Sequence, residues 1–446
     1  MRLTSGCLAA VAALAAGPAL AQETSVATEA AEAVATMDKG DIAWMMTSSL
    51  LVLFMVVPGL ALFYGGLVRT KNTLSVLMQC TLITSLVMVV WVVYGYSFAF
   101  GGGDSPYWGG LGKLFLSGVT ADSTAATFTD GVVLPEYVFI CFQMTFACIT
   151  PALIVGGFAE RMKFSAVLLF VLLWVTFVYF PIAHMVWDGA GLIFNMGALD
   201  FAGGTVVHIN AGTAALVACL VIGPRMGYGK ENLAPHSMTL TMVGASILWV
   251  GWFGFNAGSN LESNAGAALA MINTFVATAA AVLSWCVVET VARGKASMLG
   301  AASGVVAGLV AITPACGTVG PFGAIVLGAI ASACCYFFVS VVKNMFGYDD
   351  SLDVFGVHGI GGIVGAIGTG ILTSDTLGGV GYAEGVTMMG QTLTQATAVA
   401  ITIVWCGVLS FVFLMIVKAL VGLRVGPEIE REGLDLAEHG ERAYSI

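Results

Sequence analysis

The feature that most constrains this chain is a series of long apolar runs. Eleven of them follow one another from residue 42 onward, and most reach the roughly 20 residues that a helix needs to cross a bilayer. Backbone groups inside a bilayer must find hydrogen-bond partners within the protein, so such runs are expected to be helices. The runs cover 42–67, 73–100, 137–159, 164–183, 204–223, 236–257, 266–288, 297–313, 319–342, 354–372 and 396–422. The expected fold class is all-α, a polytopic membrane protein with 11 transmembrane helices in one membrane-embedded domain at 42–422.

Composition excludes a soluble globular protein. Hydrophobic residues make up 58% of the 446 residues and charged residues only 9%, where a soluble domain carries about a quarter. The formal net charge of -10 does not indicate a basic partner, because 11 of the 26 acids fall in two stretches, Glu23–Asp41 and Glu428–Glu441. The membrane-embedded body is nearly neutral, and no nucleic-acid partner is expected. The sequence has no C-x-x-C or Cys/His metal spacing, so neither a disulfide scaffold nor a metal site is indicated.

The first 21 residues have the pattern of a signal peptide. Arg2 precedes an apolar run of about ten residues, and Ala19-Leu20-Ala21 is a small-x-small cleavage pattern. The alternative, an uncleaved first transmembrane helix, would need a longer apolar run to cross a bilayer. We expect a signal peptide at 1–21, a mature start at Gln22 and a periplasmic N-terminal segment at 22–41.

Lys and Arg predict the orientation of the helices. Without the signal peptide, 13 of the 15 Lys and Arg fall in the odd-numbered connections or in and after the last helix, and the exceptions are Lys39 and Lys113. Positive residues collect on the cytoplasmic side of a membrane protein. We therefore expect a periplasmic N-terminus and a cytoplasmic C-terminal tail at 423–446, which agrees with a cleaved signal peptide.

Two of the runs share a spaced pair of polar residues. Asp200 and His208 lie at the fifth run, and Asp350 and His358 lie at the tenth, with the same interval and a displacement of 150. The copies are five helices apart, an odd number, so the second copy is inverted in the membrane, as in many transporters. We expect an inverted repeat of five plus five helices and one last helix. A chance match of one Asp and one His is the alternative.

His208 and His358 each lie inside an apolar run, where an ionisable side chain costs at least a few kcal/mol unless it faces a partner or a cavity. One such His could simply bond a backbone carbonyl. Two at matching positions favour a pair that meets across the pseudo-two-fold axis and faces a pore, and imidazole suits proton transfer near neutral pH. Asp200 precedes a helix, and its carboxylate is expected to cap backbone N–H groups, although its charge could also stabilise a nearby cation.

Aromatic residues gather near the predicted outer ends of the helices. Phe142 and Phe146 are four residues apart and share one helix face, Trp187 follows the fourth run and Ser259 follows the sixth. A small cation could rest on Phe146 and Trp187 by cation–π attraction, worth about 0.5–2 kcal/mol, while the Ser259 hydroxyl accepts a hydrogen bond. This arrangement suits ammonium, because potassium cannot donate hydrogen bonds. The alternative is that these rings only pack against lipid or neighbouring helices.

Five segments carry a resemblance to a known family: Phe63–Gly66, Phe146–Thr150, Asp200–Asn210, Trp252–Ser259 and Asp353–Gly359. From about Asp41 to the C-terminus, the chain resembles the Amt/Mep/Rh ammonium transporter family, on its bacterial Amt side. The resemblance implies a homotrimer in the bacterial inner membrane, with a separate pore for ammonium or ammonia in each subunit. Methylammonium is a candidate analogue.

The same resemblance implies roles for single residues and for the tail. It implies ammonium recruitment by Phe146, Trp187 and Ser259, a stacked gate of Phe142 and Phe255, a pore centre of His208 and His358, a structural acid at Asp200 and a pore lining by Trp252. No metal or organic cofactor is implied. The tail is similar to the ordered cytoplasmic tail at which PII-type signal proteins dock in bacterial members, with a disordered acidic tail as the alternative. The outer loop at 101–135 differs from the family pattern.

The function expected from the sequence is ammonium uptake across the inner membrane. Ammonium binds outside and loses its proton, and ammonia then crosses an apolar pore past the two His, with or without a proton relay. An ammonium sensor that signals through its tail is the alternative, and no signalling domain follows the last run. An intramembrane hydrolase is not expected, because the sequence has neither H-E-x-x-H nor G-x-S-x-G.

Overall fold

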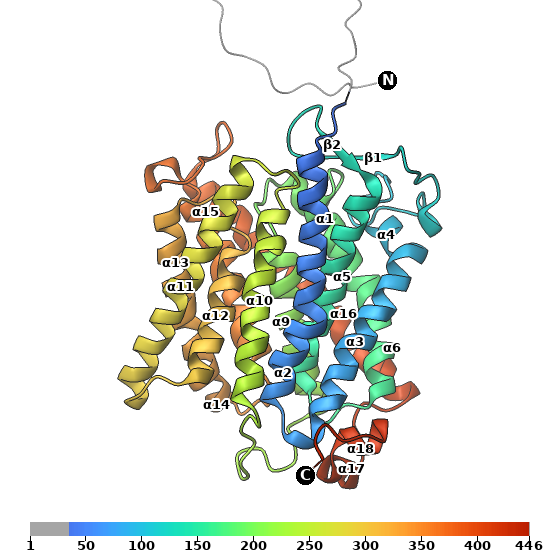
Figure 1. Cartoon of the computed structure of the whole chain (residues 1–446), viewed down its shortest axis with the longest axis vertical. Helices are drawn as coiled ribbons and strands as arrows, with labels where there is room; N and C mark the ends of the chain where they lie inside the picture. Colours follow the sequence, from blue (N-terminus) through green and yellow to red (C-terminus); the bar gives the residue numbers. More distant parts are fainter. Residues whose placement is uncertain (1–34, 446) are drawn as a thin grey trace, which may run out of the picture. The chain divides into compact units, whose positions relative to one another are not determined.

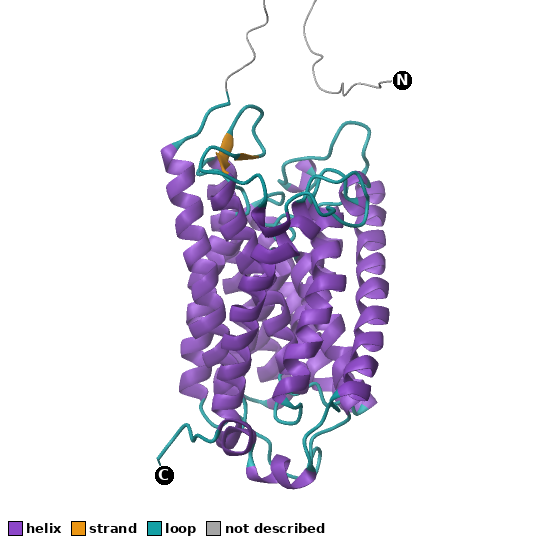
Figure 2. Cartoon of the chain, turned by 90° about the vertical axis from the view of Figure 1, so that its right-hand side faces the viewer, coloured by secondary structure: helices purple, strands orange, loops and turns teal. Residues whose placement is uncertain are grey.

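A computed structural model describes residues 35–445, so the expected signal peptide at 1–21 lies outside the described residues. Residues 36–445 form a bundle of helices that run between two ends covered by loops (Figures 1 and 2). The N-terminal end of α1 (Lys39–Phe54) and the C-terminal tail lie at opposite ends of this bundle (Figure 1). This placement is the one expected for an odd number of membrane crossings.

Ten helical spans in the described part of the chain are long and apolar enough to cross a membrane. The protein is therefore a multi-pass membrane protein. An eleventh apolar helix, α12 (Met298–Ile312), has 15 residues, fewer than the roughly 20 of a full span, so the count of eleven stays a prediction. The ten spans are Lys39–Leu67, Thr70–Phe100, Glu136–Phe158, Phe164–Asn195, Gly204–Ile222, Met238–Gly258, Ala265–Arg293, Pro321–Phe346, Phe355–Leu372 and Met388–Leu420.

Four of these spans are each a single α-helix, and six contain a π-helical turn, a local widening that often marks functional sites. The single helices are α5 (Glu136–Phe158), α10 (Met238–Gly258), α11 (Ala265–Arg293) and α16 (Met388–Leu420). The first interrupted span has η1 (Met55–Leu60) between α1 and α2 (Ala61–Leu67), and the second runs from η2 (Thr70–Asn72) through α3 (Thr73–Val90) and η3 (Trp91–Gly95) to α4 (Tyr96–Phe100). The third runs from α6 (Phe164–Trp174) through η5 (Val175–Tyr179) and α7 (Phe180–Trp187) to α8 (Leu192–Asn195), and the fourth joins η6 (Gly204–Ile209) to α9 (Asn210–Ile222). The fifth runs from α13 (Pro321–Phe337) through η7 (Phe338–Val342) to α14 (Lys343–Phe346), and the sixth joins η8 (Phe355–Gly359) to α15 (Ile360–Leu372).

Four of the six π-helical turns follow the predicted repeat. The turn η6 contains His208 and η8 contains His358, each at the start of its span. The preceding span of each half also contains such a turn, η5 in one half and η7 in the other. The same distortion therefore recurs at corresponding places in the two halves, as expected for a repeat of five helices.

The last span begins at Met388 rather than at residue 396. The predicted start is too late because Gln391, Thr392 and Gln395 interrupt the apolar run. In the structure, the side chains of Gln391 and Gln395 are buried against the protein instead of facing lipid. Polar side chains inside a span are tolerated when they hydrogen-bond within the protein.

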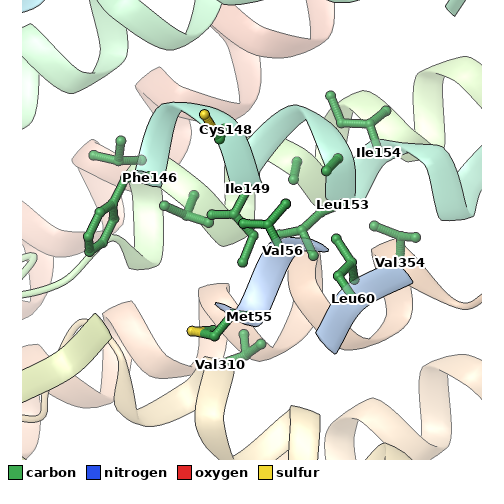
Figure 3. Close-up of a cluster of buried hydrophobic side chains, with 14 of the residues drawn as sticks. Met55, Val56, Leu60, Phe146, Cys148, Ile149, Leu153, Ile154, Val310 and Val354 are labelled. Carbon is green, nitrogen blue, oxygen red and sulfur yellow. The ribbon is translucent and has the colours of Figure 1, made fainter. Parts of the chain in front are cut away.

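One core runs through the bundle from the end at which α1 begins, which we call the outer end, to the opposite, inner end. In it, side chains of α5 such as Ile149 lie next to side chains of η1 such as Val56, and Val354 joins them from the residue before η8 (Figure 3). The spans of His208 and His358 cross next to this core at Gly212, where an added Cβ would lie 2.4 Å from the backbone nitrogen of Gly359. Glycine at this crossing lets the helices that follow His208 and His358 touch backbone to backbone.

Loops close the outer end of the bundle. The long loop at 101–135 contains η4 (Leu114–Leu116) and a two-stranded antiparallel sheet of β1 (Thr124–Ala126) and β2 (Val133–Pro135). Several contacts fasten the loop to the bundle, among them those of His184 and of Glu262. The ring nitrogens of buried His184 lie 2.8 and 2.7 Å from the carbonyl oxygens of Ala99 and Ser105, and Thr129 donates two hydrogen bonds to the Glu262 carboxylate.

Buried charges hold the inner connections together, outside the membrane-spanning segments. Glu160 accepts hydrogen bonds from Arg69 and Arg225, and Arg225 also forms a pair with Asp349 through a contact of 2.8 Å. The four residues come from the first, third, fifth and ninth connections, so these basic connections meet at one end, as the charge pattern predicted. Burial raises the pKa of Glu160 and Asp349, but the arginines lower it further, and the net shift is downward.

The tail packs on this network rather than hanging free. It contains α17 (Pro427–Glu432) and α18 (Leu434–His439), at the C-terminal end in Figure 1. The Asp435 carboxylate accepts hydrogen bonds from the backbone nitrogens of Leu74 and Ser75 at the start of α3, where a helix N-terminus favours a negative charge. Glu430 accepts a hydrogen bond of 2.7 Å from the backbone nitrogen of Met226. The tail is therefore ordered against the inner face.

We predict that Arg225→Met lowers the melting temperature of the purified protein at pH 7. Breaking a buried ion pair costs about 3–5 kcal/mol because the partner charges stay buried. Carboxyl groups with a lowered pKa stabilise the folded protein above their ordinary pKa of about 4, and that contribution is lost as pH falls through the lowered value. The difference in melting temperature between Arg225→Met and the original protein should therefore become smaller below about pH 4.

The matched control for this prediction is Arg293→Met. Arg293 is exposed, and its hydrogen bond is a 3.5 Å contact to Ser340. The Arg293→Met substitution should leave the melting temperature almost unchanged at every pH. An equal loss from both substitutions would contradict the assigned role of the buried network.

We predict that Gly433→Ala loosens the tail. Gly433 lies between α17 and α18 at φ 115°, and an added Cβ would lie 2.6 Å from the backbone oxygen of Lys71. A positive φ alone costs alanine about 1 kcal/mol, and the clash adds to it. Hydrogen exchange should become faster in residues 427–439. Gly426→Ala is the control, because Gly426 has a negative φ and no atom within 4 Å of an added Cβ, and equal exchange in the two variants would refute the prediction.

Candidate functional site

A cavity of about 590 Å³ lies at the outer end of the bundle. It is lined by the three residues expected to recruit ammonium, Phe146, Trp187 and Ser259. These come from α5, the end of α7 and the residue after α10, so the structure brings together residues far apart in sequence. Phe142 and Asp200 also line this cavity.

The polar atoms around this cavity are oriented by backbone contacts. The Ser259 hydroxyl donates a hydrogen bond of 2.8 Å to the Phe255 carbonyl oxygen, which leaves its lone pairs free to accept. The Trp187 indole N–H donates a hydrogen bond of 3.0 Å to the Asp200 carbonyl oxygen, and this contact fixes the ring. Trp187 meets Phe146 edge to face, with ring centroids 5.7 Å apart. Two ring surfaces and one acceptor therefore converge, the set that an ammonium ion can use.

Beneath the cavity, the rings are arranged differently from the sequence expectation. The expected gate was a stacked pair of Phe142 and Phe255. In the structure, the ring on Phe255 is that of Phe146, with centroids 4.2 Å apart and planes tilted by 33°. Phe142 instead meets Phe146 edge to face at 5.0 Å. Helix geometry explains why Phe146 rather than Phe142 pairs with Phe255, because Phe146 lies one turn deeper along α5 and so reaches the level of Phe255.

His208 and His358 meet in the buried centre of the bundle. Their Nδ1 atoms are 3.2 Å apart, a distance at which one ring donates a proton and the other accepts it. The donating ring then has a lone pair on its outer Nε2, and the accepting ring has an N–H there. The pair therefore presents an acceptor at one end and a donor at the other, which is the arrangement that a chain of proton transfers requires.

Aromatic rings form a continuous column between the paired rings of Phe146 and Phe255 and this imidazole pair. His208 stacks on Trp252, with centroids 5.3 Å apart and planes 16° apart, and it lies 6.0 Å from Phe255. The His208 Nε2 atom is buried without a hydrogen-bond partner in the described part of the chain. It is therefore free to bond a molecule in the column.

A second, smaller cavity lies on the other side of the pair. It has a volume of about 110 Å³, reaches His358 and is bordered by Tyr64, Val306 and Asp353 near the inner connections. Rings and imidazoles therefore separate an outer from an inner cavity. The column contains Phe146, Phe255, Trp252, His208 and His358, and all five are buried.

Asp200 acts as a helix cap in the structure. Its carboxylate accepts hydrogen bonds of 3.0, 2.5 and 2.8 Å from the backbone nitrogens of Gly203, Gly204 and Thr205, and one more from the Thr205 hydroxyl. These groups belong to the start of η6, the turn that holds His208. Asp350 does the same for the span that contains His358 by accepting from the backbone nitrogen of Phe355, whereas Asp353 pairs with Lys343.

Sequence reasoning missed Thr313. Its hydroxyl accepts a hydrogen bond of 2.9 Å from the Trp252 indole and so fixes the ring on which His208 stacks. The available signal was the segment Ile312–Ala315, which repeats Ile149–Ala152.

No group of three or more His, Cys, Asp or Glu that could hold a metal ion occurs within residues 35–445.

We predict that Asp200→Asn lowers thermal stability. An amide has one acceptor oxygen, so its NH2 group would face N–H donors that need a partner, at a cost of about 1–3 kcal/mol for each buried donor left unsatisfied. Thr205→Val is the graded control, because it removes only the hydroxyl hydrogen bond of this cap, leaves the backbone hydrogen bonds in place and should cost less. Equal melting temperatures for Asp200→Asn and the original protein would refute the capping role.

Comparison with known proteins agrees with this geometry. Residues 43–444 match the model of the Ammonium Transporter Family. A relative from Aquifex aeolicus, named ammonium transporter, is 49% identical over 418 residues that cover 92% of this chain and 95% of the relative. The crystal structure of Candida albicans Mep2 is similar, with a TM-score of 0.81 and 32% identity over 92% of this chain and 91% of that one.

A solved structure described as a sensor Amt protein is also similar. Its TM-score is 0.82 and its identity 28%, covering 90% of this chain and 98% of that one. The family model and the relatives cover nearly the whole described chain, and their names describe transporters rather than enzymes. The chain belongs to the ammonium transporter family.

Proposed function

We propose that this protein takes up ammonium across the bacterial inner membrane. Ammonium binds in the outer cavity and loses its proton at the stacked rings of Phe146 and Phe255, and ammonia then passes His208 and His358 to the inner cavity. The observation that carries the proposal is the buried column of rings and imidazoles between two cavities. A column of this kind passes small neutral molecules more readily than ions.

The outer cavity supports selection of ammonium. Phe146 and Trp187 offer ring faces to a cation, and the free lone pairs of Ser259 accept a hydrogen bond from it. Potassium has a similar size but no N–H to donate, so the acceptor discriminates between them. The nearest carboxylate, Asp200, is engaged with η6, so its charge acts on the cation without contact.

The proton follows a separate path in this proposal. A bare cation in an apolar column costs several kcal/mol more than a neutral molecule, so ammonium gives up its proton at the entrance. The hydrogen bond between His208 and His358 supports a relay in which one imidazole donates as the other accepts. Net transport of one charge then accompanies each ammonia molecule.

The surroundings of the pore are part of the same proposal. The charge pattern supports a periplasmic N-terminus and a cytoplasmic tail, and the family resemblance supports a homotrimer with one pore in each subunit. The ordered tail offers a surface to a PII-type signal protein at the inner face. Its contacts with the connections around the inner cavity, such as that of Glu430 with Met226, give such a partner a route to the pore.

An ammonium sensor is the second candidate, favoured by the likeness to the sensor Amt protein and by the docked tail. A growth assay distinguishes a transporter from a sensor. Cells without their own ammonium transporters should regain growth on limiting ammonium, at an acidic pH where ammonia is scarce, when they express this protein. Membrane-inserted protein that restores no growth would favour the sensor and contradict the transporter.

We predict that His208→Asp loosens selectivity against potassium. The substitution puts a fixed negative charge beside His358, and that charge stabilises a cation that the original column excludes. Potassium entry should rise roughly tenfold, which corresponds to about 1.4 kcal/mol. Potassium uptake into proteoliposomes measures the effect.

His208→Ala is the control for the added charge. It removes the imidazole without adding a carboxylate, so it should leave potassium excluded. Unchanged potassium entry in His208→Asp would count against the imidazole pair as the selective centre of the pore.

A further inference from the structure

One side chain of the last helix reaches the backbone of both halves of the repeat. Gln395 lies on α16, which the repeat does not include, and it is buried (Figure 1). Its Oε1 accepts a hydrogen bond of 2.7 Å from the Leu199 nitrogen, and its Nε2 donates bonds of 2.7 and 3.1 Å to the carbonyl oxygens of Leu199 and Ala366. Leu199 precedes the span of His208, and Ala366 follows His358 on α15.

The contact with Leu199 has the geometry of a clamp. One amide side chain satisfies both the N–H and the C=O of a single residue, so it fixes the position and the rotation of that peptide segment. Gln391, one turn earlier on α16, adds a hydrogen bond of 2.9 Å to the Gly197 carbonyl oxygen and one to the Gln395 oxygen. Residues 197–199 are thus held at two points by one helix face.

The clamp leads directly to the outer cavity. The residue after Leu199 is Asp200, whose carbonyl oxygen accepts the indole N–H of Trp187 at 3.0 Å. Leu199, Asp200 and Trp187 all line that cavity. A shift of the segment would move the only hydrogen-bond partner that the described residues give to the Trp187 indole. The ring would then lose its orientation toward Phe146.

The close approach of α15 and α16 makes the clamp possible. At Gly370, an added Cβ would lie 2.7 Å from the Thr392 Cα and 3.1 Å from the Gln395 Cγ. Glycine at this position lets α16 approach until the Gln395 amide reaches the Ala366 carbonyl. The Gln395 amide then makes all four of its possible hydrogen bonds: its oxygen accepts two and its nitrogen donates two.

We infer that Gln395 is a positioning residue for ammonium recruitment: it holds the Leu199–Asp200 backbone so that Trp187 presents its ring to the cation. Gln395 itself does not touch the ion. The inference rests on the proposed recruitment at Phe146, Trp187 and Ser259, and it assigns to the last helix a role in substrate affinity. A purely structural role would change the amount of folded protein but not the concentration dependence of transport.

The test measures uptake of isotope-labelled ammonium into proteoliposomes over a range of concentrations. Gln395→Met keeps the approximate shape of the side chain and removes all its hydrogen bonds. The half-saturating concentration should rise about fivefold, the size of one partly desolvated cation–π contact, with little change in the maximal rate. Gln391→Met, which leaves the Leu199 clamp in place, should give a smaller shift in the same direction and provides a second variant if the first folds poorly.

Thr402→Val is the matched control. Thr402 is buried on the same helix, and its hydroxyl bonds only within that helix, to the Ala398 carbonyl oxygen. It should leave the half-saturating concentration unchanged. A shift equal to that of Gln395→Met would mean that any polar loss in α16 has the same effect, and it would overturn the inference.

A double variant separates this inference from the proposed function. Trp187→Leu alone should raise the half-saturating concentration, and adding Gln395→Met should raise it no further, because both act on one contact. If Trp187→Leu shifts the value but Gln395→Met does not, or if the two effects multiply, the inference is wrong and recruitment stands. If Trp187→Leu causes no shift, recruitment at this cavity is wrong and the inference falls with it.

Discussion

An unpaired polar group or a charge inside a bilayer costs several kcal/mol, and the polar side chains of this protein are placed accordingly. Asp200 lies beside the outer cavity with its carboxylate bound to the start of η6. The imidazoles of His208 and His358 bond each other in the centre of the bundle. Buried ion pairs, such as that of Arg225 with Glu160, lie at the inner connections, where opposite charges compensate each other. The column between the cavities is left without a formal charge, so it favours ammonia over ammonium.

Close helix contacts place the functional groups. The crossing at Gly212 and Gly359 brings the spans of the two imidazoles together, and the approach at Gly370 lets the Gln395 amide reach both halves. Hydrogen bonds then set the rotation of individual rings. The Trp187 indole donates to the Asp200 carbonyl oxygen at the outer cavity, and the Trp252 indole donates to the Thr313 hydroxyl in the column. In the proposed mechanism, the rings that meet the substrate are thus oriented by residues that do not touch it.

Long apolar runs and the repeated Asp and His were enough to predict a multi-pass helical bundle and the meeting of His208 with His358, because both depend on spacing along helices. The aromatic gate was predicted with the wrong partner for Phe255, because the sequence does not give the depth at which α5 passes α10. Gln395 lies just before the predicted start of the last run at residue 396, and no role was predicted for it. Its role depends on a backbone segment about 200 residues away, and spacing in one sequence does not report such contacts.

The central claim is that ammonia and its proton cross separately, the proton by way of the imidazole pair. The most direct measurement is the transient current in proteoliposomes after an ammonium pulse, recorded together with internal pH. The account predicts a current for the original protein and its loss in both His208→Ala and His358→Ala, with the liposomes intact. A rise of internal pH without any current in the original protein would show that ammonia crosses alone, and it would contradict the relay.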